Sequence, residues 1–145
     1  MINTVLVTDD SALDNAVLRN YLYNERLNLI SALNGREALD MLEGRKIDVI
    51  ILDMMMPVMD GLTFLSEFKK TAYYEAIPII VTTNSDSDDM IKKVIGEYEI
   101  FDYIIKPLDR INKLILVNRI KAAIRYRNVM KELSTLKAHA AEGGK

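Results

Sequence analysis

The strongest constraint on the fold is a series of short β-branched runs, each of which ends abruptly at a polar residue. The clearest run covers residues 48–52 (DVIIL) and is followed at once by Asp53. Runs that are apolar throughout are typical of strands in a parallel sheet that helices cover on both faces. Four further runs predict strands over residues 4–8, 27–32, 79–82 and 103–105.

Helical patterns separate these runs. After the first run, Leu18 and Leu22 lie at helical spacing, and Ser11 is a good N-cap. We predict helices over residues 11–24, 36–42, 62–70 and 86–95, the last opened by the cap-rich stretch 84–86, and a long helix from 109. Strands that alternate with helices predict an α/β fold, a doubly wound parallel sheet of five strands with five helices.

Composition limits the chemistry of the chain. With 145 residues, 50% of them hydrophobic and 28% charged, it has the size and balance of one globular domain. It has no cysteine, which excludes disulfides and cysteine metal sites. Its single histidine, His139, argues against a histidine-rich metal site and a histidine-based catalytic triad. A net charge of −2 argues against a nucleic-acid surface. We find neither a membrane span nor a signal peptide and expect a cytoplasmic protein.

Chemically reactive side chains follow the predicted strands. In open α/β sheets, ligands bind beyond the carboxyl ends of the strands. Three crowded carboxylates repel one another unless a cation joins them, and oxygen ligands suit Mg²⁺. A lysine and a threonine beside them suit a phosphoryl group, with Asp53 as its acceptor because Asp53 ends the central strand. The residues at these strand ends are Asp9, Asp10, Asp53, Thr82, Thr83 and Lys106.

Each of these residues alone has an ordinary structural explanation. The pair Asp9 and Asp10 fits a helix cap, Thr82 is a good strand former, and Lys106 fits a solvated surface. All of these explanations would have to hold at four separate strand ends. We therefore favour a shared site at this edge of the sheet.

Four motifs occur in the order of a known family: VLVTDDS, DVIILDMMMPVMDG, IPIIVTTN and FDYIIKPLD. Through them the chain resembles the receiver domain of two-component response regulators, over about residues 3–125. The resemblance implies a flavodoxin-like receiver fold and a receiver domain over residues 1–125. It also implies a phosphorelay signalling switch whose only catalysis is its own phosphotransfer and dephosphorylation.

The resemblance also assigns roles to individual residues. Asp53 would be the phosphoacceptor, served by a histidine kinase or phosphotransfer protein. The Mg²⁺ ligands would be Asp10, Asp9 through water, Asp53 and the backbone carbonyl of Met55. Lys106 would pair with the phosphoryl oxygens, and its bond to Pro107 would be cis.

Two further residues match the family's switch. Thr83 lies five residues after Pro78, as the family's switch hydroxyl does, and Thr82 remains the rival. Tyr103 matches the aromatic residue that turns inward. The resemblance implies that the face formed by the fourth helix, fifth strand and fifth helix changes shape and binds partners, including a second copy.

The last helix has two apolar patterns. We expect Leu114, Val117, Ile120 and Ile124 to pack on the sheet. A helix over residues 109–140 would be about 48 Å long, too long to stay on one domain. Residues 126–145 are therefore either a charged, fraying tail or a coiled-coil lead to a second receiver or to an output domain that these residues do not include. The second pattern alternates by four and three, as heptads do, at Ala122, Tyr126, Val129, Leu133, Leu136 and Ala140.

Two other functions remain open. A Mg²⁺-dependent hydrolase with an aspartyl-phosphate intermediate would need a second acid two residues after the nucleophile, where this chain has Met55. A phosphorylation-independent interaction module would not need the full set of site residues. We expect the signalling switch.

Overall fold

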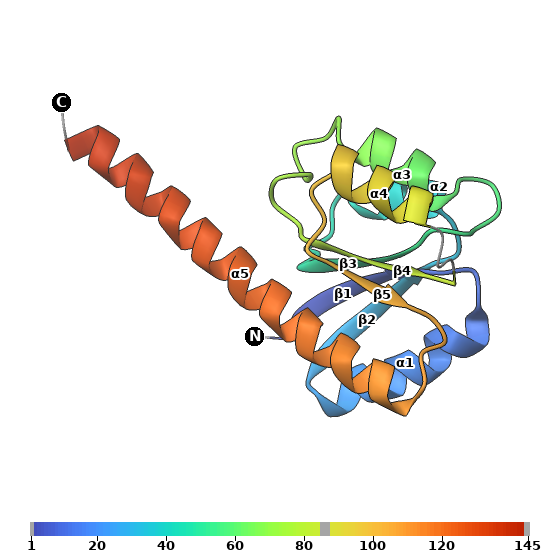
Figure 1. Cartoon of the computed structure of the whole chain (residues 1–145). Coiled ribbons are helices and arrows are strands. Elements are labelled where there is room, and N and C mark those ends of the chain that lie inside the picture. The colour runs from blue at the N-terminus through green and yellow to red at the C-terminus, as the bar shows by residue number, and fades with distance from the viewer. Residues whose placement is uncertain (1, 85–87, 144–145) are drawn as a thin grey trace.

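The computed structural model describes residues 2–84 and 88–143, and within these ranges five strands alternate with five helices (Figure 1). The sheet is parallel throughout, with strand order β2-β1-β3-β4-β5, which confirms the predicted fold class. The strands are β1 (Asn3–Thr8), β2 (Leu27–Ala32), β3 (Val49–Asp53), β4 (Ile79–Thr83) and β5 (Asp102–Ile105). The helices are α1 (Ala12–Asn24), α2 (Gly35–Met41), α3 (Gly61–Phe68), α4 (Asp88–Glu97) and α5 (Arg110–Gly143).

The predicted boundaries agree with these elements to within two residues where the structure describes both. Ser11 caps α1 as expected, because its side chain accepts a hydrogen bond from the Asp14 backbone N–H. Strand β3 begins one residue later than predicted and includes Asp53. The Asp48 carboxylate instead accepts a hydrogen bond from the backbone N–H of Thr4. The predicted start of the fourth helix at residue 86 lies outside the described residues.

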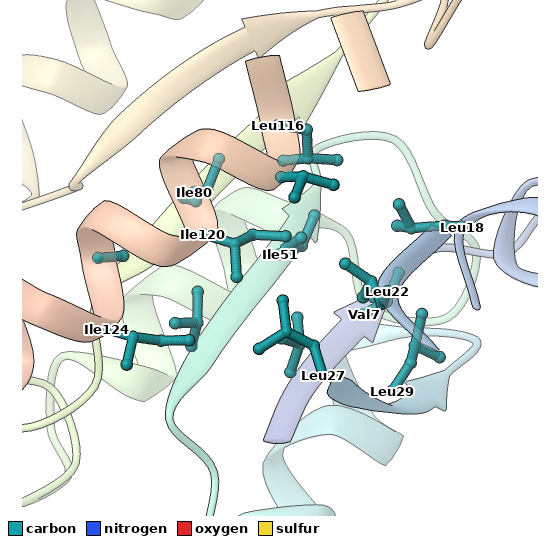
Figure 2. Packing of buried hydrophobic residues seen from close by; sticks show 14 of the residues in the cluster. Val7, Leu18, Leu22, Leu27, Leu29, Ile51, Ile80, Leu116, Ile120 and Ile124 are labelled. Carbon is teal, nitrogen blue, oxygen red and sulfur yellow. The ribbon is translucent and has the colours of Figure 1, made fainter. Parts of the chain in front are cut away.

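Two apolar cores lie on opposite faces of the sheet. Helices α1 and α5 cover one face, while α2, α3 and α4 cover the other (Figure 1). On the first face, Leu18 and Leu22 of α1 and Ile120 of α5 meet Val7 and Ile51 of the sheet (Figure 2). On the second, Phe64 and Phe68 of α3 are fully buried. Because the strands are covered on both sides, they read as continuous apolar runs in the sequence.

The prediction that all four residues of the apolar stripe on α5 are buried is wrong for one of them. Leu114 is 54% exposed, whereas Leu116 is fully buried. Residues advance about 100° around a helix, so Leu114 lies about 120° away from Ile120. The other predicted members of the stripe, Val117, Ile120 and Ile124, are buried.

Helix α5 leaves the domain after its buried stripe. The side chains of residues 128–143 are all exposed, and this part of the helix projects away from the sheet (Figure 1). Arg127 stands at the exit, where its Nη1 donates to Asp48 Oδ1 at 2.7 Å and its Nε donates to the Ala76 carbonyl at 3.1 Å. Across the described residues, no helix has both the length and the apolar character needed to cross a membrane.

Candidate functional site

Three carboxylates come together at the carboxyl edge of the sheet. One oxygen from each of Asp9, Asp10 and Asp53 lies within 4.8 Å of the others. Strands β1 and β3 are neighbours, with Thr8 opposite Leu52, so the next residues, Asp9 after β1 and Asp53 at the end of β3, lie side by side. Asp9 and Asp53 are buried, and Asp10 is exposed. The predicted acidic cluster is therefore present, and solvent reaches it from the side of Asp10.

Asp9 is held by the start of α1. Its Oδ1 accepts a hydrogen bond from the Ser11 backbone N–H at 2.9 Å. Its backbone carbonyl accepts a hydrogen bond from the Asn15 side-chain amide at 3.0 Å. The sequence analysis missed Asn15, which is buried although it is polar. The available signal was its place at helical spacing with Leu18 and Leu22 on the apolar face of α1.

Lys106 bridges two of the carboxylates from the end of β5. Its Nζ donates to Asp9 Oδ2 at 2.7 Å and to Asp53 Oδ2 at 3.2 Å. Burial alone would lower the pKa of Lys106, but the hydrogen bond to Asp9 and the negative charges of Asp53 and Asp9 outweigh burial and raise that pKa. Lys106 is therefore a fixed positive charge inside the site. The Lys106–Pro107 peptide is cis, as the resemblance implied.

Burial raises the pKa of Asp53 above its ordinary value, and the nearby charge of Asp9 adds to this effect. The backbone N–H of Met55, which donates to Asp53 Oδ1 at 3.1 Å, lowers the pKa, as does Lys106. The net result is a carboxylate whose negative charge is costly in the fold. Protonation of this side chain or a cation bound beside it would relieve that cost.

Thr83 and Tyr103 lie on the same face of the sheet. Thr83 ends β4, is fully buried, and accepts a hydrogen bond at its backbone carbonyl from the Lys106 N–H at 2.7 Å. Tyr103 on β5 packs against the core formed with α2, α3 and α4. Burial raises the pKa of Tyr103, whereas an interaction with the Thr83 side chain lowers it. Thr82, the rival switch residue, is also buried and lies opposite Asp53 in the strand pairing.

The loop after Asp53 is packed closely at Gly61. A Cβ on Gly61 would lie 2.7 Å from the Met54 Cα and 2.9 Å from the Asp53 carbonyl oxygen. Because backbone atoms cannot move aside as a flexible side chain does, this position requires glycine. Gly61 N–H also donates to the Met54 carbonyl at 3.1 Å, which closes the loop onto the end of β3. The loop thus fixes the backbone around Asp53 and Met55.

The residues present suit a magnesium ion. Hard carboxylate oxygens are its preferred ligands. One oxygen from each of the three carboxylates lies within 4.8 Å of the others, so a single cation placed among them would interact with all three. The cluster has three carboxylates, and the ammonium group of Lys106, which contacts two of them, leaves two negative charges to be neutralised. A divalent cation matches both the geometry and the charge.

The fold and the acidic edge define a class of protein, the phosphoacceptor modules of two-component signalling. The chain belongs to the response regulator receiver domain family, whose model matches residues 5–118. This match confirms the resemblance seen in the four motifs.

Curated relatives and solved structures are consistent with this family. The chain is 42% identical over 106 residues to the sensor histidine kinase CheAY of Helicobacter pylori. The aligned region covers 71% of this chain and 13% of CheAY. The chain is also 35% identical over 124 residues to the transcriptional regulatory protein CpxR of Escherichia coli K12, covering 85% of this chain and 50% of CpxR. The receiver domain of the Francisella response regulator 1452 superposes with a TM-score of 0.75 at 25% identity, covering 86% and 98% of the two chains. The chain thus spans only part of these two curated relatives.

Proposed function

We propose that this receiver domain is a signalling switch in which Asp53 accepts a phosphoryl group in the presence of Mg²⁺. The observation that carries the proposal is the cluster of Asp9, Asp10 and Asp53, bridged by Lys106, at the carboxyl edge of the sheet. Receiver domains exchange phosphoryl groups with histidine kinases. The donor for this chain is therefore a phosphohistidine on a kinase or phosphotransfer protein, and the exchange takes place in the cytoplasm.

The transfer needs no residue outside the site. An Asp53 oxygen attacks phosphorus, a P–O bond forms, and the P–N bond to the donor histidine breaks. The electron pair of that bond stays on the histidine nitrogen. Lys106 already touches an Asp53 oxygen, so its ammonium group is placed to pair with the incoming phosphoryl oxygens.

Asp9, Asp10, Asp53 and the Met55 carbonyl would hold Mg²⁺, which offsets the negative charge of the phosphoryl group. Asp9 is the member that the chain holds most firmly, through Ser11 and Asn15. The Met55 backbone is tied to Asp53 by its own N–H, so the residue that would offer the carbonyl lies next to the acceptor. The oxygen atoms that would bind Mg²⁺ therefore belong to backbone and side-chain groups whose positions the fold already fixes.

Thr83 is the proposed switch hydroxyl and Tyr103 the aromatic residue that follows it. Thr83 and Tyr103 lie on the same face of the sheet, whereas Thr82 points to the other face, which favours Thr83 over Thr82. A phosphoryl group on Asp53 offers oxygens to the Thr83 hydroxyl, and a shift of Thr83 toward them would let Tyr103 turn inward. The α4–β5–α5 face, which contains Tyr103, is then the surface whose partners change.

The test is the intact mass of the whole chain after incubation with a small-molecule phosphodonor, with and without Mg²⁺. We expect wild type to gain one phosphoryl group that depends on Mg²⁺, and Asp53→Ala to gain none. Asp14→Ala is the matched control, because Asp14 is an exposed carboxylate on α1 outside the cluster. No gain in wild type under either condition would favour the phosphorylation-independent module, whereas an equal gain in Asp53→Ala would show that the phosphoryl group is carried by another residue and would overturn Asp53 as the acceptor.

A further inference from the structure

The projecting part of α5 carries a stripe of exposed apolar side chains. Val129, Met130, Leu133 and Leu136 are between 42% and 60% exposed. Tyr126, which is 52% exposed and contacts Phe101 on one side, stands at the base of this stripe. A single exposed helix of this length is marginal in water without tertiary packing. We therefore expect the stripe to bind a partner, and the spacing of its residues indicates which kind of partner.

Four members of the stripe repeat by three and four residues. Tyr126 and Leu133 occupy heptad position a, Val129 and Leu136 occupy position d, and Ala140 takes the next a position. This 3.5-residue period matches the seam along which two helices wind around each other. A second copy of the chain presents the same seam, so the two helices are complementary without any further element.

The charges beside the seam favour one orientation. With Leu133 at position a, Glu132 falls at g and Lys137 at e. In a parallel, in-register pair, each g residue faces the e residue five positions later in the other helix, so Glu132 faces the partner's Lys137. In an antiparallel pair, g faces g and e faces e, so these two residues never meet. Two symmetric ion pairs therefore form only in the parallel arrangement.

The domain holds the base of this helix in place. Arg127, beside the first seam residue, is bonded to the buried carboxylate of Asp48 and to the Ala76 carbonyl. The Tyr126 ring contacts the Phe101 ring, with centroids 5.7 Å apart, just before β5. The direction in which the seam leaves the domain is thus set before any partner binds.

We propose that the chain forms a parallel, in-register homodimer through a coiled coil of α5 residues 126–140, independently of phosphorylation. The two receiver domains lie at the same end of the coiled coil. This inference does not depend on the phosphoacceptor role of Asp53.

Sedimentation equilibrium of the full chain, without phosphodonor, tests the association. We expect a dimer, and we expect Leu133→Lys/Leu136→Lys to weaken dimerisation at least about a hundredfold, because each helix loses two buried leucines. The matched control, Ser134→Lys/Ala138→Lys, adds the same charge at positions b and f and should leave the dimer intact. A monomeric wild type, or a dimer that the Leu133 and Leu136 changes leave unaltered, overturns the proposal.

The absence of cysteine from the sequence allows a direct test of orientation. Facing a positions in a parallel pair bring Ala140 of both chains together, so Ala140→Cys should form a disulfide-linked dimer on mild oxidation. Ala138→Cys, which points outward at position f, should form little. Equal cross-linking at both positions, or none at residue 140, contradicts the parallel arrangement even if the chain is dimeric.

The charge pairing has its own test. Glu132→Lys and Lys137→Glu should each weaken self-association, because like charges then face each other. A mixture of the two single variants should recover the dimer, because both facing pairs then carry opposite charges. In one pair the two substituted side chains meet, and in the other the native Glu132 meets the native Lys137. A mixture that associates no better than either variant alone overturns the proposed register.

Discussion

The ion pair between Asp48 and Arg127 offers a quantitative test of how α5 is joined to the sheet. The two side chains are only 4% and 16% exposed and are 2.7 Å apart. Asp48→Ala would leave the Arg127 guanidinium without its carboxylate and the Thr4 backbone N–H without its acceptor. Removing one member of a buried pair costs about 3–5 kcal/mol, a large part of the roughly 5–15 kcal/mol by which domains are stable.

Urea unfolding followed by far-ultraviolet circular dichroism measures this cost, since the chain has no tryptophan. We expect Asp48→Ala and Arg127→Met each to destabilise the fold. We expect the variant that carries both changes to lose about 1–3 kcal/mol less of its free energy of unfolding than the two single variants lose together. The reason is that the second change removes a charge that the first change has already left unpaired.

Asp40→Ala is the control for this cycle. It breaks the exposed pair of Arg36 and Asp40, whose side chains are 53% and 69% exposed, and should cost no more than about 0.5 kcal/mol. If the losses of the two single variants sum to the loss of the double variant within about 0.5 kcal/mol, Asp48 and Arg127 do not stabilise the fold as a pair. An Asp48→Ala variant that is as stable as Asp40→Ala would likewise show that this pair does not stabilise the fold.

Three further predictions follow from the packing and the charges. Gly61→Ala should destabilise the chain by about 1–3 kcal/mol in urea unfolding, because the new Cβ meets backbone atoms. Gly96 lies in helix α4 with open space around it, so Gly96→Ala should instead stabilise the chain by up to about 1 kcal/mol. In the same assay, Leu116→Ala should cost about 2–5 kcal/mol and Leu114→Ala less than about 1, and the reverse order would contradict the placement of α5. The pKa of Asp53 is raised in the fold, so the folded chain binds the proton of this carboxyl group more tightly than the unfolded chain does. The stability contributed by Asp53 is therefore complete below pH 3.8 and is lost as the pH rises through the raised pKa of the folded state. Without Mg²⁺, Asp53→Asn should therefore be more stable than wild type at pH 7, with the gain vanishing below pH 3.8; a less stable variant at pH 7 would contradict the sign.

The fold was predictable because its signals are local. Each strand is an unbroken apolar run such as residues 48–52, and helix starts carry capping residues such as Ser11. The carboxyl-edge rule for open α/β sheets then placed Asp9, Asp53 and Lys106 together without any long-range information. Their proximity in the structure follows from which strands are neighbours, and the predicted connections already limited those neighbours.

What the sequence did not reveal depends on helix rotation and on contacts between distant residues. Leu114 and Leu116 are both apolar, and only the rotation of α5 against the sheet decides which one is buried. The pairing of Asp48 with Arg127 joins residues 79 positions apart. Asp48 begins the motif DVIILDMMMPVMDG, but nothing in that motif indicates Arg127 as its partner. Asn15 is a similar case, because a buried asparagine on an apolar stripe gives no sign of the backbone carbonyl it contacts.

Whether Asp53 itself carries the phosphoryl group is decided by locating the modified residue. After treatment of the whole chain with a phosphodonor and Mg²⁺, borohydride converts an aspartyl phosphate into homoserine, and peptide mass spectrometry shows where the change lies. We expect homoserine at position 53 and none in Asp53→Ala. Homoserine at Asp9, Asp10 or any other position, or unmodified Asp53 in a chain that gained a phosphoryl group, would contradict this expectation.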